Sequence, residues 1–359
     1  MTAPRPIDGG TCHVFHAFEA ARQVDLDVAA HRIRGSGRTG LAAGDRNTGG
    51  ADFEPKPLRV TVAAPPVRCG SAETLATAHV TVFDFGAISV RLDLPLSGTA
   101  DGLVALSRTL VGHEDLRSSA ERIAREVLSA IGDAALRPEI GGRSEDYSVF
   151  SLPPHADDPR AGLPDALLAK ILRADEAELS PEEVRDAVAA SISYATADLA
   201  VVDWNCAVVV DRRPEDALAV LEFANVELIE MRWLDDRLDR ALDEAYRTAG
   251  ESLRGPRILA VQTIRHSRRI AELQLDAAAL YEGVNNALKL FGDQWLARLH
   301  GAATRRMHIE DYERSVLRKI EALDSVYAKL RDRQVQVRAE ILEWIIIALI
   351  AVEILLFLK

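Results

Sequence analysis

A cysteine and two histidines near the N-terminus are the first residues whose types and spacing could bind a metal ion. Cys12, His13 and His16 offer the thiolate and imidazole groups that zinc prefers. A closed zinc site needs about four such ligands, and the other cysteines, Cys69 and Cys206, stand far away without a CxxC pair. The run CHVFHAF is more typical of an ordinary strand with a polar edge. We therefore predict no metal site, no cofactor and no disulfide framework, as in a chain from a reducing compartment.

Carboxylates crowd one long predicted helix and could supply general acids or bases. The pattern pairs none of them with a nucleophile or a base, and the chain has neither a P-loop nor a GxSxG elbow. Most runs of this kind are solvated helix surface. The sequence therefore predicts a protein that is not an enzyme. The carboxylates concerned are Glu222, Glu227, Glu230, Asp235, Asp236 and Asp239.

Arginines form patches on helices in the second half of the chain. One patch is Arg265, Arg268 and Arg269, and the other is Arg305 and Arg306. These side chains could contact anionic lipid headgroups or RNA, or they could form a solvated helix face. The chain has 43 Lys and Arg against 55 Asp and Glu, a formal charge of −12. This balance argues against non-specific nucleic-acid binding by the whole chain, and we expect no sequence-specific DNA binding.

The elements that must position these residues are of two kinds. Runs with strand character, such as LRVTVAA, HVTVFDF and CAVVVD, are mixed with helical stretches as far as residue 213, which predicts an α+β or α/β head. We assign 1–33 to an N-terminal strand–helix piece of the head, 34–57 to a Gly-rich linker or loop, and 58–213 to the α/β head. Residues 214–340 are predicted to form a helical stalk, followed by an apolar helix over 341–358.

Two segments of the head share the signature of a tight hairpin. VFDFGAISV and VVDWNCAVV each place an Asp and an aromatic residue before a residue type that tolerates positive φ. The turn residues are Asp84 and Gly86 in the first segment, and Asp203 and Asn205 in the second. The two segments are either a duplicated hairpin-and-helix unit or independent hairpins whose turns need similar residue types. The sequence pattern leaves both interpretations open.

Apolar residues in the last part of the stalk recur with alternating spacings of four and three, which predicts a coiled-coil seam. The seam could pack against the preceding helix as an intramolecular hairpin or against another protomer, and we predict a homo-oligomer through the stalk. Continued further, the spacing reaches Ala348 and Ala351, small residues that let two helices approach closely. The seam consists of Val316, Ile320, Leu323, Tyr327, Leu330, Gln334, Val337, Ile341 and Trp344.

The last segment, 341–358, is apolar enough to predict a membrane anchor. Thirteen of its 18 residues are Ile, Leu, Val or Phe, and a helix of this length spans about 27 Å, close to the hydrocarbon thickness of a bilayer. Glu343 would lie at headgroup depth and Glu353 within reach of the far interface. Arginines precede the segment, so the bulk of the chain would face the cytoplasm. We predict a single-pass, tail-anchored membrane protein; the alternative is a buried C-terminal core helix.

Parts of the chain resemble the required-for-meiotic-nuclear-division family of sporulation (YagE-like) proteins, a domain of unknown function. The resemblance rests on VFDFGAISV and on the terminal RAEILEWIIIALIAVEI, in which Glu343, Trp344 and Glu353 match the family's ending. LEFANVELIEMRWLDDRLD is similar to the long helix of bacterial members. The resemblance implies an oligomeric tether, which in mitochondrial relatives supports translation. The Arg-rich, Lys-poor composition favours a bacterial member, and thus the bacterial inner membrane.

Together these features predict a tail-anchored, oligomerising scaffold without enzymatic activity. Its head would bind a protein or ribonucleoprotein partner, and the basic stalk would hold it near a lipid bilayer. The alternative is a regulatory or catalytic head that binds a small ligand and is merely localised by the tail.

Overall fold

The computed structural model describes residues 6–35, 41–43, 55–154, 158–252 and 294–357. The chain divides into two compact units. The first comprises 1–231 with 280–310, and the second comprises 232–279 with 311–359. The first unit is a mixed α/β head, and the described residues of the second are helical.

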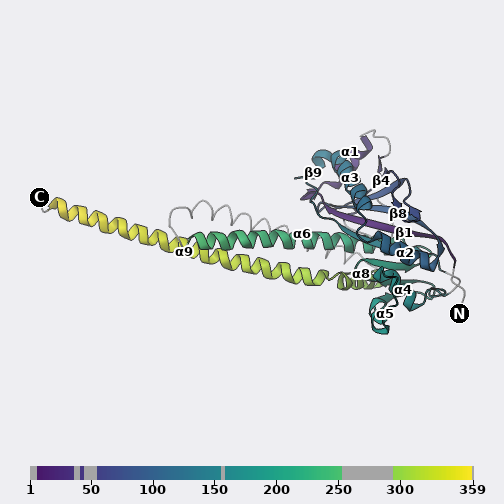
Figure 1. Ribbon diagram of the computed structural model, residues 1–359. Coiled ribbons are helices and arrows are strands. Elements are labelled where there is room, and N and C mark those ends of the chain that lie inside the picture. The colour runs from purple at the N-terminus through teal and green to yellow at the C-terminus, as the bar shows by residue number, and fades with distance from the viewer. Residues whose placement is uncertain (1–5, 36–40, 44–54, 155–157, 253–293, 358–359) are drawn as a thin grey trace. The chain divides into compact units, whose positions relative to one another are not determined.

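A nine-stranded mixed sheet forms the centre of the head (Figure 1). Its order is β11–β12–β13–β10–β1–β8–β7–β4–β3, and only the β10–β13 pair is parallel among the neighbouring strands that the structure describes. Two small ladders pair β2 with β9 and β5 with β6. The strands are β1 (Pro6–Glu19), β2 (Gln23–Val24), β3 (Leu41–Ala43), β4 (Leu58–Ala63), β5 (Arg68–Cys69), β6 (Ala72–Glu73), β7 (Thr77–Val82), β8 (Ala87–Thr99), β9 (Ala135–Leu136), β10 (Glu145–Leu152), β11 (Ser191–Ile192), β12 (Leu199–Val202) and β13 (Cys206–Val210).

Helices occupy most of the sequence ranges that their apolar periodicity predicts, and the predicted mixture of strands and helices in the head is confirmed. Two long helices belong to both units, since α6 begins in the head and continues in the second unit, and α9 begins just before the second unit. The helices are α1 (Leu26–Gly35), α2 (Ala100–Leu110), α3 (Glu114–Ile131), η1 (Gly132–Ala134), α4 (Asp165–Arg173), α5 (Pro181–Ala187), α6 (Glu215–Ser252), α8 (Gln294–Arg306) and α9 (Ile309–Phe357).

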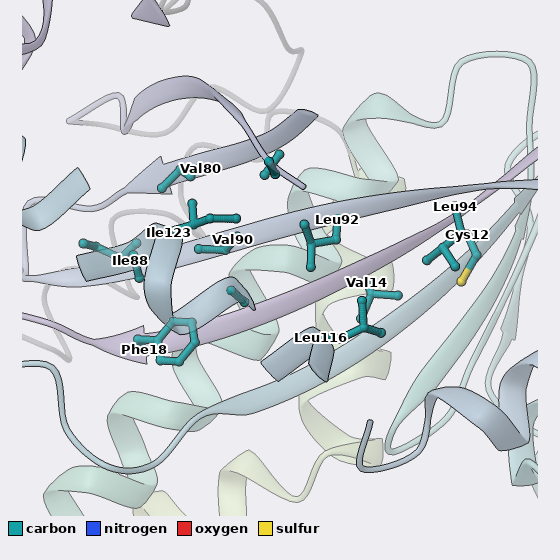
Figure 2. Packing of buried hydrophobic residues seen from close by; sticks show 14 of the residues in the cluster. Cys12, Val14, Phe18, Val80, Ile88, Val90, Leu92, Leu94, Leu116 and Ile123 are labelled. Atoms are coloured by element: carbon teal, nitrogen blue, oxygen red, sulfur yellow. The ribbon is translucent and has the colours of Figure 1, made fainter. Parts of the chain in front are cut away.

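The main core lies between one face of the sheet and α3. Strand residues alternate between the two faces, so Val14 and Phe18 of β1 share a face with Leu92 of β8. Figure 2 shows Leu116 of α3 next to Val14, and Ile123 of α3 farther along the same face of the sheet. All five are 1% exposed or less. Removing this apolar surface from water, at about 25 cal/mol per Å², is what holds the helix on the sheet.

His16 lies on this same apolar face of β1. Its burial there predicts that the stability of the head falls at acidic pH. Its side chain is buried, and neither ring nitrogen has a hydrogen-bond partner among the described residues. Burial, together with the positive charges of Arg117 and His113, lowers the pKa of His16 from 6.5 to about 4. The folded head therefore holds a neutral imidazole, while the unfolded chain protonates it below about pH 6.5.

We expect the head to lose up to about 3 kcal/mol of its free energy of unfolding through His16 as the pH falls from about 6.5 to about 4. His16→Phe should remove this component, because phenylalanine does not titrate. Urea unfolding at a series of pH values measures it, with His31→Gln on the exposed surface of α1 as the control. Equal acid sensitivity of the wild type and His16→Phe would show that other groups cause it.

Helix α6 packs against the end of β7 and the start of β10, and this overturns part of the carboxylate prediction. Phe223 of α6 packs on Phe83, with ring centroids 6.1 Å apart. Glu222, Glu227 and Glu230 are 8%, 3% and 5% exposed, so they are not the solvated surface that the charge pattern predicts. The number of charged residues in a helical sequence does not reveal whether other elements cover the helix on more than one side. Here α8 supplies His300, whose Nε2 lies 3.0 Å from Oε2 of Glu227.

In the second unit, α6 and α9 run side by side in the same direction. Arg232 stacks on Tyr312, Ser315 donates a hydrogen bond to Asp235, and Lys319 pairs with Asp239. The residue numbers within each pair differ by 80 (312 − 232, 315 − 235, 319 − 239), as parallel helices require. Three predicted seam residues are buried in this unit: Val316, Leu323 and Tyr327. The first part of the seam therefore packs within the chain, on α6 as a parallel pair.

The predicted membrane helix is contradicted by the structure. Among the described residues, no helix is both long and apolar enough to cross a membrane. The transmembrane helix over 341–358, the tail anchor and the single-pass membrane localisation are therefore wrong. Glu343 and Glu353 leave an uncharged stretch of only nine residues, 344–352, about 14 Å of helix, which is roughly half of the hydrocarbon thickness. A buried core helix is wrong as well, because the side chains of 342–354 are exposed.

Candidate functional site: an arginine-lined cavity beside a buried ion-pair cluster

A buried carboxylate at the end of β12 is the centre of an ion-pair cluster. Asp203 is 1% exposed and begins the turn to β13, where its backbone N–H donates to the carbonyl of Cys206 at 2.9 Å. Its side chain accepts hydrogen bonds from Nη1 of Arg173, at 2.6 Å, and from Nε of Arg306, at 3.1 Å. Arg173 ends α4 and Arg306 ends α8. The cluster thus joins two helices to the hairpin.

Helix α5 completes the cluster with two further carboxylates. Asp186 accepts from Nη2 of Arg173 at 2.5 Å, and its backbone carbonyl accepts from Nη2 of Arg306 at 2.9 Å. Glu183 lies 2.6 Å from Nε of Arg173. The hydrogen bond from Arg306 lowers the pKa of Asp186, whereas burial raises the pKa of Asp203 even though both guanidinium groups oppose the rise.

A cavity of about 690 Å³ opens beside this cluster. One wall is formed by residues 189–192, which include the edge strand β11, and the other is the face of α8 between Gln294 and Arg306. Its volume lies within the range of small-molecule pockets. Three of the lining residues are arginines, and the described lining contains no acidic residue.

Small residues on α8 keep the floor of the cavity open. Ala297, Gly301 and Ala302 recur at helical spacing beside Arg298 and Arg305, so all five share one face of the helix. A Cβ atom at Gly301 would lie 3.4 Å from Nη1 of Arg305, so the guanidinium group reaches back over the glycine. The arrangement presents cationic groups above a surface of backbone and methyl groups.

A second polar cluster lies on the second face of the sheet. Nδ1 of His13 is 2.7 Å from Oδ1 of Asp93, Nε of Arg91 is 3.1 Å from the same oxygen, and His79 is 3.7 Å from Oδ2. Although burial raises it, the hydrogen bond from His13 and the charge of Arg91 hold the pKa of Asp93 below its ordinary value. The carboxylate thus already has the guanidinium group of Arg91 and two imidazole groups as neighbours. Cys12 and His16 lie on the other face of β1, and no metal-binding group of three or more such side chains occurs among the described residues.

Several of the residues singled out in the sequence meet at the cavity, whereas others lie elsewhere. Asp203 and Arg306 form an ion pair at 2.8 Å, and Arg305 lines the cavity. The remaining arginines, Arg265, Arg268 and Arg269, lie outside the described residues. The sequence interpretation missed Arg173, Glu183, Asp186 and Arg298. Of these, only Arg298 carried a signal, because it stands seven residues, about two helical turns, before Arg305.

Both predicted hairpins form, but only the first has the predicted turn conformation. Both hairpins form, as β7–β8 and β12–β13, but they meet different neighbours, since β8 pairs antiparallel with β1 and β13 pairs parallel with β10. Gly86 has φ +107°, as predicted, and the backbone carbonyl of Asp84 accepts from the N–H of Val24. Asn205 is not among the described residues with positive φ, so that expectation is wrong. Its turn is closed by the backbone of Asp203 instead.

The apolar tail residues predicted to pack helices belong to the second unit, whereas this site belongs to the first. Glu343, Trp344, Ala348, Ala351 and Glu353 are all exposed on α9. The structure does not describe the side chains at four other positions of the seam. Those positions are Leu330, Gln334, Val337 and Ile341.

Comparison with known proteins places the head in a family whose function is uncharacterized. The family model described as the N-terminal domain of the uncharacterized protein MJ0711 matches residues 9–217, which run from β1 to the start of α6. The uncharacterized protein MJ0711 of Methanocaldococcus jannaschii is 23% identical over 218 residues, covering 60% of this chain and 66% of that protein, slightly less than two thirds of its length. No solved structure matches. The chain belongs to the family of the MJ0711 N-terminal domain.

Proposed function

We propose that this protein is a non-enzymatic scaffold that assembles through the end of α9. One observation carries the proposal: ten large apolar side chains between 342 and 356 are 49–71% exposed. A continuous apolar surface of this kind is typical of an interaction site. The residues are Leu342, Trp344, Ile345, Ile346, Ile347, Leu349, Ile350, Val352, Ile354 and Leu356.

The register of the seam supports a second copy of this chain as the occupant. The offset of 80 between α6 and α9 would place the end of α6, Ser252, opposite residue 332 (252 + 80). Beyond that point α9 continues for 25 residues (357 − 332), and the described part of α6 supplies no neighbour for them. The heptad spacing nevertheless continues through Trp344, Ala348 and Ala351. The same seam of another copy would supply a self-complementary partner for this part of α9.

The head would then present a binding surface in several copies. A protein or ribonucleoprotein partner for this surface is proposed from the resemblance to the required-for-meiotic-nuclear-division family, which also supports a bacterial source. Several heads on one stalk would raise the avidity for such a partner without any new contact. The proposal needs no catalytic group in the head.

Charged substitutions in the seam test the assembly. In Ala348→Arg/Ala351→Arg, association would bury guanidinium groups without a counter-charge, which costs several kcal/mol. We expect the association constant to fall by about a hundredfold or more. Sedimentation equilibrium of the full chain measures it, and the wild type should show at least twice the mass of one chain.

The matched control is Leu317→Arg, because Leu317 is an exposed apolar residue of α9 that lies off the seam and outside the apolar end. This variant should keep the mass of the wild type. A wild-type chain that is monomeric at every concentration would contradict the proposal, as would equal masses of the two variants. A monomer whose apolar end binds lipid vesicles would assign the surface to another occupant.

A further inference from the structure

The arginines that face the cavity beside α8 differ in what neutralises them. Arg306 is held by Asp203 and Asp186, so its charge is already compensated. The side chains of Arg298 and Arg305 have no ion pair and no hydrogen bond within the described part of the chain. Two guanidinium groups therefore face one cavity, and no described residue occupies their N–H donors.

The geometry of this face fits an anion better than an apolar ligand. Arg298 and Arg305 stand two turns apart on α8, about 10 Å along the axis, with Gly301 and Ala302 between them. Long arginine side chains can close over this distance onto one group. The opposite wall, residues 189–192, adds no charge, and the side-chain hydroxyl of Ser191 already donates to the carbonyl of Val188 at 2.6 Å. The uncompensated charge of the lining is thus about +2, which matches a dianion.

We propose that this cavity binds a phosphate-bearing small molecule, with Arg298 and Arg305 as its two cationic contacts. The planar guanidinium group donates two parallel hydrogen bonds to phosphate oxygens, a geometry that a lysine cannot supply. The cavity volume of about 690 Å³ leaves room for an organic group beyond the phosphate. This site is independent of self-association, because its residues belong to the head and not to the second unit.

Titration calorimetry of the full chain with inorganic pyrophosphate, at physiological salt, tests the site. The wild type should bind the probe. Arg298→Gln and Arg305→Gln should each weaken binding by about tenfold or more, and the double variant should lose it. Arg185→Gln is the matched control, since Arg185 is an exposed arginine of α5 that does not line the cavity. Both target side chains are exposed, so the variants should keep the wild-type melting temperature.

A second pair of variants separates charge from shape. Ala297→Glu places a carboxylate on the cavity floor and should abolish binding, whereas Ala297→Gln, of the same size, should retain most of it. The proposal is overturned by a wild type that does not bind pyrophosphate, or by equal affinities of the wild type and the double variant. Binding of a single-stranded oligonucleotide through both arginines without binding of pyrophosphate would overturn it in favour of an RNA surface.

Discussion

A Gly86→Ala chain is expected to lose more than about 4 kcal/mol of its free energy of unfolding, enough to unfold a domain of ordinary stability. Gly86 has φ +107°, and a Cβ atom there would lie 1.7 Å from the carbonyl oxygen of Ala21. The clash is with backbone, so no side-chain rotation can relieve it. The same glycine carbonyl accepts hydrogen bonds from the N–H groups of Ala20 and Ala21. Moving the turn away would therefore break the contact between the hairpin and the segment after β1.

A second glycine separates the backbone strain from the clash. Gly98 has φ +113°, almost the same value, but nothing lies within 4 Å of the position that a Cβ atom would take there. Gly98→Ala should cost only the strain of an alanine at positive φ, about 1–2 kcal/mol. Urea unfolding followed by circular dichroism compares the two variants. Equal losses would show that the contact with Ala21 contributes nothing.

Asp203→Ala is expected to cost about 3 kcal/mol, because it leaves two partly buried guanidinium groups beside an empty carboxylate position. Arg173 and Arg306 have side chains that are only 18% and 20% exposed, so water cannot fully replace the lost acceptor. The backbone contact from the Tyr147 hydroxyl to the Asp203 carbonyl survives the substitution. The loss should therefore report on the ion pairs.

An exposed ion pair provides the comparison for Asp203. Asp165 pairs with Arg160, and their side chains are 52% and 42% exposed. Asp165→Ala should change the free energy of unfolding by less than about 1 kcal/mol. Thermal and urea unfolding measure both variants. A loss for Asp203→Ala no larger than that for Asp165→Ala would mean that Asp203 does not fasten α4 and α8 to the hairpin.

Most of the sheet could be predicted from the sequence because its strands carry local signals. CHVFHAF, AISVRLDL and CAVVVD all lie mainly within strands, and the predicted helical stretches of the head are present as well. The hairpin at Gly86 was predictable as well, since the turn needs a residue that tolerates positive φ. The order of the strands in the sheet could not be predicted. The pairing of β10 with β13, for example, joins two segments that are separated by a crossover, and no local pattern specifies it.

The candidate site was only half predictable, for a related reason. Asp203 and Arg306 each drew attention, but they are 103 residues apart and nothing local pairs them. The buried Glu227 read as surface because its covering partner, His300, comes 73 residues later. The length and mean apolarity of 341–358 also predicted a bilayer span, although Glu343 and Glu353 divide the apolar run. For the Asp203–Arg306 pair and for Glu227, contacts between residues far apart in the sequence determine the environment, and composition does not reveal such contacts.

Cysteine cross-linking at Ala348 tests most directly whether the end of α9 pairs with another copy. The native cysteines, Cys12, Cys69 and Cys206, are all buried, so Ala348→Cys adds the one exposed thiol among the described residues. Paired seams bring the two new thiols close enough for a disulfide. We predict a disulfide-linked dimer of the full chain after mild oxidation at low protein concentration, and none for Glu182→Cys on the exposed surface of α5. Equal, collision-limited cross-linking of the two variants would contradict self-association through this seam.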